Sequence, residues 1–358
     1  MIEAFLNLVR LGIGQKVEIF PNSVDWEALK ALAEQQGLSA VVLDGIEWFK
    51  SLNVQGVQGP PQKLLLEWIG ETLQNENVYA AQQKAANNMV ELFHKNGIRT
   101  YVLKGTVIAE CYPKPACRLS ADLDCYLLPE EGDFDAWTLG NDLIKAKGFA
   151  VIDDFYKNSK FLLPELTVEN HQYFTPFRGN ETLKSLERLL QKQIRNDKGE
   201  DRMEGSSLYR PPVMTSALFI IEHAYSHFLH EGLTWRMVLD WMMFRCKHEK
   251  EIDWKQLVAW IDEFGLGKFY DSYYRLGRYL VGELRVESLG FRDNLMLEDI
   301  WAELDVHDTV KGIKGKLALA GNTWRARWKY NHFSNISMAH ALWIQVKGFL
   351  FEKNPSLD

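Results

Sequence analysis

Two aspartates, Asp122 and Asp124, alternate with apolar residues in a segment typical of a β-strand. Because successive side chains of a strand point to opposite faces, the two carboxylates share one face at adjacent pleats. Carboxylates that close repel each other, and burying them is costly unless a cation lies between them. A hard divalent ion such as Mg²⁺ takes oxygen ligands and keeps some positions for water and substrate phosphate. The pair therefore indicates metal-dependent chemistry on phosphate groups.

Acidic residues of this spacing also arise by chance, because the chain has 48 acidic residues. Asp133 and Asp135 have the same spacing, but no apolar alternation surrounds them, and we expect them in a solvated turn. The apolar context therefore distinguishes Asp122 and Asp124 from this second pair.

The segment before the aspartates predicts a strand, a turn and a short helix. Residues 99–103 are rich in β-formers, and Lys104, Gly105 and Thr106 then open a helix that Pro113 ends. Glycine lets backbone N–H groups approach a phosphate, threonine caps the helix or donates its hydroxyl, and a helix N-terminus attracts anions. The lysine adds a positive charge that suits a triphosphate. The alternative is an ordinary turn with an exposed lysine, and the aspartates downstream favour the phosphate site.

Three segments resemble the uncharacterised bacterial branch of the nucleotidyltransferase superfamily, whose core is similar to DNA polymerase β. They are Leu-Lys-Gly at 103–105, YPKPACR at 112–118 and the Asp-x-Asp strand. The superfamily signature is a hydrophobic residue, glycine and serine at a helix start, followed by Asp-x-Asp on the next strand. Thr106 stands where serine is more usual, and the gap of fifteen residues before Asp122 is long but suits this branch. The resemblance covers about residues 95–175.

The resemblance implies a Mg²⁺- or Mn²⁺-dependent enzyme that moves a nucleoside monophosphate from a nucleoside triphosphate to a hydroxyl or phosphate of an acceptor. The implied catalytic residues and metal ligands are Asp122, Asp124 and Glu169. The residues expected to bind the nucleotide are Lys104, Gly105, Thr106, Arg118, His171, Arg236 and Asp240. The alternative is a catalytically inactive binding or regulatory protein on the same scaffold, in which Glu169 would lie far from the aspartates.

The third acid comes from residues 166–174, which read as a later strand. Alternation places Glu169 and His171 on one face of that strand, and relatives of this branch have a similar acidic-x-His pattern here. The alternative is a strand edge with a solvated glutamate and a hydrogen-bonded histidine. The rivals for the third metal ligand are Asp153 and Asp154. Lys160 is a weaker candidate for phosphate contact.

Residues 213–247 are expected to be helical and carry a second group of polar residues. His223 and His227 are four apart on one helical face, and so are Arg236 and Asp240. The resemblance implies a helical domain that closes over the nucleotide, whereas the alternative is an arginine–aspartate pair and two histidines satisfied in the core. A metal-dependent hydrolase centred on the histidines is a weaker hypothesis, because the glutamate that follows the first histidine in zincin helices is an alanine here.

The hydrophobic pattern predicts an α+β protein with three parts. They are an N-terminal helical region over 1–95, a core of alternating strands and helices over 96–180, which the resemblance identifies as the nucleotidyltransferase core, and a C-terminal helical domain over 181–358. The resemblance implies that the core is polymerase β-like, with a small mixed sheet and helices. The helices expected outside the core include one capped by Asn22 or Ser23, one over 39–50, one over 62–94 and one over 297–319.

The composition narrows the partners and the compartment. The net charge is −7 without a basic stripe, which favours a small-molecule or protein acceptor over long nucleic acid. The four cysteines lack CxxC spacing and read as free thiols of a reducing cytoplasm. No secretory pattern and no apolar run of membrane-spanning length stands out, so we expect a soluble cytoplasmic protein.

Overall fold

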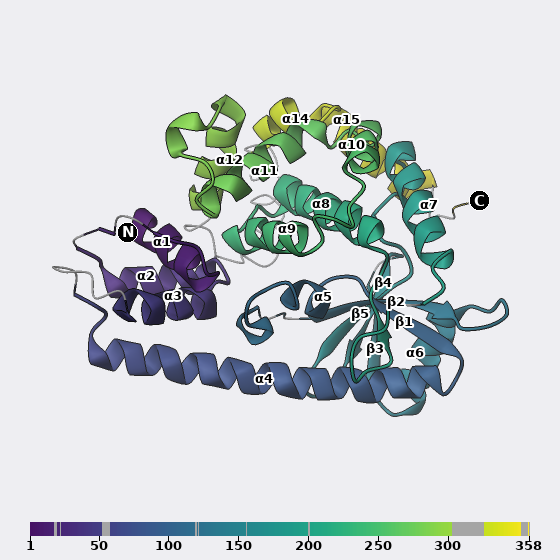
Figure 1. The fold of residues 1–358 in the computed structure, drawn as a ribbon. Helices are drawn as coiled ribbons and strands as arrows, with labels where there is room; N and C mark the ends of the chain where they lie inside the picture. Colours follow the sequence, from purple (N-terminus) through teal and green to yellow (C-terminus); the bar gives the residue numbers. More distant parts are fainter. Residues whose placement is uncertain are drawn as a thin grey trace, which may run out of the picture.

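The computed structural model describes residues 1–17, 20–21, 23–51, 58–118, 120, 122–154, 156–199, 201–302, 326–351 and 357. It is a mixed α+β fold in which a six-stranded sheet lies between one long helix and a layer of C-terminal helices (Figure 1). None of the described helices is both long enough and apolar enough to cross a membrane.

Three helices form the N-terminal part: α1 (Ile2–Gly12), α2 (Trp26–Gln35) and α3 (Ser39–Ser51). The cap predicted at Asn22 or Ser23 is wrong, because the side chain of Asp25 accepts a hydrogen bond from Ala28 N at 3.0 Å. A short connection leads from α2 to α3, and α3 agrees with the helix predicted over 39–50.

Helix α4 (Gln62–His94) joins two separate hydrophobic cores and confirms the helix predicted over 62–94. Near its start, Trp68 is buried in the larger core and its indole Nε1 donates to Ser39 Oγ at 2.7 Å. Near its end, Val90 and Phe93 are buried in the smaller core beneath the sheet. The helix therefore connects the N-terminal helices to the sheet (Figure 1).

The sheet has the strand order β3-β4-β5-β2-β1-β6. Its strands are β1 (Ile98–Val102), β2 (Asp122–Pro129), β3 (Ala150–Asp154), β4 (Asn158–Leu162), β5 (Thr167–His171) and β6 (Leu208–Tyr209). Strand β2 is antiparallel to β1 and parallel to β5, so both predicted acidic strands are neighbours near the middle of the sheet. Strand β6 was not expected, because it is a two-residue strand in a region whose pattern is helical.

The alternation predicted for β2 is confirmed by the way its side chains divide between the two cores. Leu123, Cys125 and Leu127 lie in the smaller core, together with residues of α4 and α6 (Ala136–Ala146). Tyr126 lies in the larger core, where its ring stacks on Phe174 with a centroid separation of 4.9 Å. Asp122 and Asp124 share the face of Tyr126, so they point toward the C-terminal helices.

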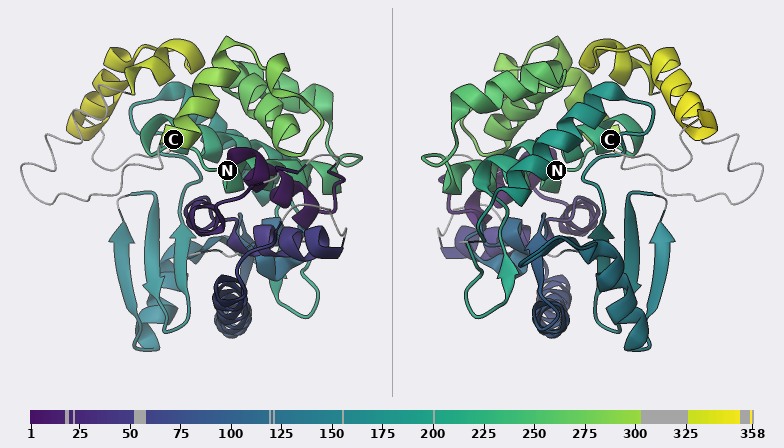
Figure 2. Two further views of the ribbon diagram at one scale, coloured as in Figure 1. Left: turned by 90° about the vertical axis from the view of Figure 1, so that its left-hand side faces the viewer. Right: turned by 90° about the vertical axis from the view of Figure 1, so that its right-hand side faces the viewer.

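The C-terminal helices lie above the sheet in both views of Figure 2, and Tyr126 of this face shares the larger core with them. They are α7 (Glu181–Arg195), α8 (Val213–His230), α9 (Trp235–Lys247), α10 (Trp254–Glu263), α11 (Gly267–Leu280), α12 (Phe291–Ala302), α14 (Arg327–Phe333) and α15 (Met338–Phe351). Most of the helix predicted over 297–319 lies outside the described residues. The expected helical stretch 213–247 is two helices, α8 and α9, separated by a short turn.

The N-terminal and C-terminal helices share the larger core. Arg10 donates to two carbonyl oxygens at the end of α11, those of Leu280 at 2.9 Å and Tyr279 at 2.7 Å. Gln36 Oε1 accepts from Trp235 N, at the start of α9, at 2.7 Å. Segments more than 190 residues apart in the sequence therefore complete one core.

Candidate active site

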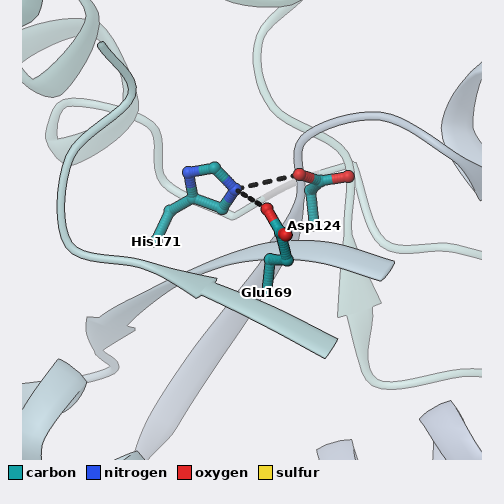
Figure 3. A group of neighbouring side chains, drawn as sticks. All are labelled: Asp124, Glu169 and His171. Carbon is teal, nitrogen blue, oxygen red and sulfur yellow. Dashed lines mark hydrogen bonds and ion pairs between the residues drawn. The ribbon is translucent and has the colours of Figure 1, made fainter. Parts of the chain in front are cut away.

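The register of β2 and β5 brings three predicted site residues together. Asp124 lies opposite Glu169, and His171 lies one pleat further along β5 on the same face. One ligand atom from each of the three side chains lies within 4.8 Å of the others (Figure 3). Strand alternation places Glu169 and His171 on a common face, and the parallel pairing with β2 turns that face toward Asp124.

Asp124 is completely buried and is held as a charged carboxylate. His171 Nε2 lies 2.9 Å from its Oδ1 and donates to it, and Lys104 Nζ lies 3.3 Å from its Oδ2. Burial works to raise the pKa of Asp124, but the charge of Lys104 and the hydrogen bond from His171 hold it far below its usual value. Within the described residues, Oδ2 has no hydrogen-bond donor, so it keeps lone pairs for another ligand.

Glu169 is held in place from the neighbouring strand β4. Its Oε2 accepts from Asn158 Nδ2 at 2.9 Å, and its Oε1 pairs with Lys160 Nζ at 3.0 Å. Lys160, which the sequence offered as a phosphate contact, therefore already neutralises a carboxylate. The second carboxylate oxygen, Oε2, also lies 3.7 Å from His171 Nε2.

Asp122 lies beside the three-residue group and faces a small hollow. Burial and the neighbouring charge of Asp124 raise the pKa of the Asp122 carboxyl. The hollow is also lined by Gly105, Thr106 and Arg118, and its volume of about 10 Å³ holds roughly one water molecule. A phosphate group therefore requires these side chains to move apart.

The turn after β1 depends on glycine, as the sequence predicted. Gly105 has φ +69°, and a Cβ at this position would lie 3.3 Å from Ser120 Oγ. The predicted helix to Pro113 is too long, because α5 (Thr106–Ala109) has only four residues. Thr106 does not cap it either, since it is the first helical residue and its hydroxyl accepts from Gln83 Nε2 at 3.0 Å. So short a helix has a small dipole, so any anion bound at this turn would depend on the backbone N–H groups more than on the helix.

Lys104 lies between the sheet and helix α8. Its Nζ is 3.3 Å from Asp124 Oδ2 and donates to His223 Nε2 at 3.0 Å. Burial, together with the charge of Lys104, lowers the pKa of His223 well below its usual value, so the imidazole is neutral and accepts this hydrogen bond. The lysine therefore contacts the predicted metal ligand as well as a histidine of the helical layer.

Arg118 and Asp240 form a buried pair. Arg118 Nη2 and Nε donate to the two carboxylate oxygens of Asp240 at 2.8 and 3.1 Å, and Tyr112 OH donates to the same carboxylate at 2.7 Å. The ion pair of Asp240 is thus with Arg118 and not with Arg236. Arg118 Nη1 is buried without a hydrogen-bond acceptor among the described residues, and this side chain lines the hollow.

Arg236 lies half-buried near the same charges. Burial and the positive charge of Arg118 lower its pKa, while Asp240 and Asp122 act in the opposite direction. Its aliphatic stem packs close to Gly37, where an added Cβ would lie 3.1 Å from Arg236 Cδ. The side chain therefore lies between the N-terminal helices and the carboxylates.

The histidine pair on α8 has no third metal ligand in the part of the chain that the structure describes. The rings of His223 and His227 are 4.4 Å apart, and His227 Nδ1 pairs with Glu231 Oε2 at 2.8 Å. The only group of three metal-ligating residues found there is Asp124, Glu169 and His171. The rival ligand Asp153 is exposed on β3, the edge strand, with β4 and β5 between it and β2.

Sequence reasoning missed the residues that support the site. Asn158 and Gln83 hold Glu169 and Thr106 in place, and Tyr112 holds Asp240. Asn158 could have been identified from the sequence, because a hairpin of β4 and β5 places Asn158 beside the strand that holds Glu169. The partners of Gln83 and Tyr112 come from distant segments, and no local pattern identifies them.

The candidate site thus lies on the two central strands of an α+β fold and includes a candidate metal-binding triad. A family model described as an uncharacterised nucleotidyltransferase matches residues 22–282, which is most of the chain. The chain therefore belongs to this family of nucleotidyltransferases, and the match includes every site residue named above. No curated protein and no solved structure matches it.

Proposed function

We propose that the chain is an active, metal-dependent nucleotidyltransferase of the polymerase β-like superfamily. It transfers a nucleoside monophosphate from a nucleoside triphosphate to a hydroxyl or phosphate of an acceptor. The observation that supports this most is the position of Glu169, whose ligand atom lies within 4.8 Å of those of Asp124 and His171. An inactive scaffold would not need a third acid beside the strand aspartates.

The side chains fit a divalent cation. Asp124 is charged, fully buried and has an oxygen, Oδ2, without a hydrogen-bond donor in the described part of the chain. Asp122, Asp124 and Glu169 would hold Mg²⁺ or Mn²⁺, which would polarise the α-phosphate and offset the charge that develops on its oxygens. His171 orients Asp124 through its Nε2 hydrogen bond, as groups behind metal ligands commonly do.

In this proposal Lys104 has two roles, one toward Asp124 and one toward the nucleotide. In the present structure its ammonium group offsets the charge of Asp124, 3.3 Å away. With a cation bound at Asp124, the flexible lysine side chain would be available to bind a phosphate oxygen of the nucleotide. The neutral ring of His223 keeps the lysine at the interface between sheet and helices.

The turn and Arg118 bind the phosphates that leave. Gly105, Thr106 and Arg118 line the same hollow, and Arg118 Nη1 has no hydrogen-bond acceptor among the described residues. In the reaction, an acceptor oxygen attacks the α-phosphorus and the bond to the β-phosphate oxygen breaks, so pyrophosphate leaves. The acceptor proton passes to Glu169, or Glu169 serves as a metal ligand only.

The acceptor is a small molecule or a protein rather than long nucleic acid in this proposal, and the reaction takes place in the cytoplasm. The net charge of −7 and the four free thiols support these two points. In this proposal the parts expected from the sequence have different roles. The central part contains the catalytic residues, and the C-terminal helices close over the nucleotide.

Calorimetric titration of ATP, CTP, GTP and UTP, with and without Mg²⁺, tests the proposal. We expect metal-dependent binding of at least one nucleotide, lost in the Asp122→Ala/Asp124→Ala variant. Asp153→Ala is the matched control, because it removes an exposed acid of the same sheet. Circular dichroism verifies that each variant is folded. Binding that is unchanged in the double variant, or no binding at all, would contradict the proposed site.

A further inference from the structure

A large cavity lies next to the candidate site, on the side of helix α8. Its volume is about 1150 Å³, and it is bounded by α8, the turn over residues 176–183 and helices α14 and α15. Aromatic side chains line much of it: Tyr156, Tyr225, Phe264, Tyr330 and Trp343. Ligand pockets in proteins typically have volumes of roughly 300–1,000 Å³, so this space accommodates a molecule larger than a single sugar ring.

Glu222 is the unusual residue of this cavity. Its side chain lines the cavity although the residue is only 3% exposed. It makes no hydrogen bond or ion pair with any residue that the structure describes, and burial raises its pKa to about 7. Lys157 is the positive group that acts on it, and Glu187 adds a negative charge. A buried carboxylate without a partner is costly, and such groups commonly have a ligand to bind.

Two other titratable groups of the cavity, Glu231 and His223, are already engaged. Glu231 is mostly exposed and pairs with His227 at 2.8 Å. His223, also in the cavity wall, accepts a hydrogen bond from Lys104. Glu222 therefore stands apart as a buried acid whose charge has no direct counterpart among the described residues.

The cavity reaches the reacting centre through His223. This residue lines the cavity, and its Nε2 is 3.0 Å from Lys104 Nζ, which is in turn 3.3 Å from Asp124 Oδ2. A molecule bound in the cavity therefore ends close to the carboxylates, with His223 and Lys104 between it and Asp124.

We propose that this cavity binds the acceptor and that Glu222 binds an ammonium or guanidinium group of that acceptor. The proposal rests on the proposed function, because it assumes that transfer takes place at Asp124. A cation at Glu222 offsets the cost of the buried carboxylate. The faces of neighbouring aromatic rings, such as that of Tyr225 one turn along α8, attract the same cation. Trp343, which is 62% exposed, supplies apolar surface for the body of the acceptor.

Two probes of equal shape test the charge at Glu222. Phenethylamine carries an aromatic ring and an ammonium group, and 2-phenylethanol replaces the ammonium group with a hydroxyl. We expect calorimetry at pH 8 without nucleotide to show at least tenfold tighter binding of the amine. In Glu222→Gln, which keeps shape and hydrogen bonding, this preference disappears. Glu231→Gln, which removes an already paired acid of the same cavity, retains it.

A second variant separates the cavity from the nucleotide site. Ser226→Trp places a large side chain in the cavity one turn after Glu222. We expect it to lose phenethylamine binding and to keep the metal-dependent binding of nucleoside triphosphate. Conversely, Asp122→Ala/Asp124→Ala loses nucleotide binding and keeps the amine. Failure of the proposed function therefore leaves a distinct pattern from failure of the cationic subsite.

Three results would overturn the cationic subsite. One is equal binding of the two probes to the native protein. Another is an amine preference that persists in Glu222→Gln. The third is the absence of binding by both probes at millimolar concentration, which would indicate that Glu222 closes on Lys157 instead.

Discussion

The two sides of the aspartate pair are built in opposite ways. On the side of the Gly105 turn, the hollow holds roughly one water molecule, and Arg118 is fixed by a bidentate pair with Asp240. On the side of α8, the cavity has a volume of about 1150 Å³, and the buried Glu222 has no partner among the described residues. One side is closed and contains the buried Arg118–Asp240 pair, whereas the other is open and keeps an acid without a partner among the described residues.

This difference corresponds to two different binding tasks in the proposed reaction. The phosphates of a nucleotide are the same in every turnover, so one small set of binding groups, which must first move apart, serves every reaction cycle. An acceptor has its own shape and charge, so its binding site needs a larger volume and a charged group that binds the acceptor in preference to water. The comparison predicts that changes on the turn side affect nucleotide binding and stability, and changes on the α8 side affect acceptor binding.

Asp124→Asn removes the charge that both sides share, and we expect the largest effect from it. Transfer should fall at least 10³-fold, which corresponds to about 4 kcal/mol of transition-state stabilisation. The reason is that an amide provides neither the charge nor both lone-pair sets of the buried carboxylate. Pyrophosphate release with the preferred nucleotide measures the rate.

Asp153→Asn is the control for this change, because it removes an exposed acid at the far edge of the sheet. Its rate should stay within a factor of two or so of the native rate, as surface substitutions usually have small effects. An Asp124→Asn variant that retained a tenth of the native rate would show that the reaction takes place elsewhere.

Asp240→Asn tests whether the turn side is held by a buried ion pair. Arg118 would keep its charge without its carboxylate, and both residues are only 5% exposed. We expect the free energy of unfolding to fall by about 3–5 kcal/mol, because an uncompensated buried charge is strongly destabilising. Urea denaturation measures the change.

The double variant Arg118→Met/Asp240→Leu separates stability from binding. It removes both charges, so it should recover most of the lost stability. Nucleotide binding should stay weak, because Arg118 Nη1 is missing from the hollow. Recovery of nucleotide affinity together with stability would mean that Arg118 has only a structural role.

Glu222→Gln tests the open side through the pH dependence of stability. Burial raises the pKa of Glu222 to about 7, whereas the usual value is 4.5. Between these pH values the folded protein keeps a proton that the unfolded chain has released, so the free energy of unfolding falls as pH rises. The variant lacks this decline and should exceed the native protein by about 3 kcal/mol at pH 8, and not at pH 4. Urea denaturation at both pH values measures the difference.

Glu263→Gln provides the reference, since Glu263 lines the same cavity but is exposed. It should leave the pH dependence of the native protein unchanged. Identical curves for Glu222→Gln and the native protein would show that Glu222 has a cation partner in solution.

Gly105→Ala has the smallest expected effect and acts on the closed side. A residue with a Cβ at φ +69° is strained, and this Cβ also lies 3.3 Å from Ser120 Oγ, so we expect a loss of about 1 kcal/mol. Gly97→Ala has almost the same backbone angle, φ +71°, with nothing within 4 Å of the added atom. Both variants should lose stability in urea, but only Gly105→Ala should weaken nucleotide binding. Equal nucleotide affinity in the two variants would remove the turn from the phosphate site.

The central strands could be predicted from the sequence because each has one clear period. Leu123, Cys125 and Leu127 face one core, and the polar residues between them face the other, so β2 was evident. The segment that holds Glu169 had the same alternation. The length of α5 was overestimated, because its apolar residues suit a helix although the chain must turn back toward β2.

The pairing of Arg118 with Asp240 joins residues 122 positions apart, and no local pattern specifies it. The sequence indicated that Asp240 faces the cleft or pairs with Arg236, and its actual partner comes from the loop before β2. Glu222 was overlooked although it follows a run of five apolar residues on α8, which is an available signal of a buried acid. Long-range ion pairs depend on how layers dock, and that information is spread over the whole chain.

The shared core of the terminal helices sets an order for biosynthesis. The apolar face of α1 is completed by α11 and α12, where Phe5 meets Trp301 with ring centroids 6.2 Å apart. At about 5–20 residues per second, a ribosome needs roughly 15–60 s to make the intervening chain. During that interval the first helices leave the ribosome with their final partners not yet synthesised. The nascent protein therefore presents apolar surface to chaperones until translation passes residue 301.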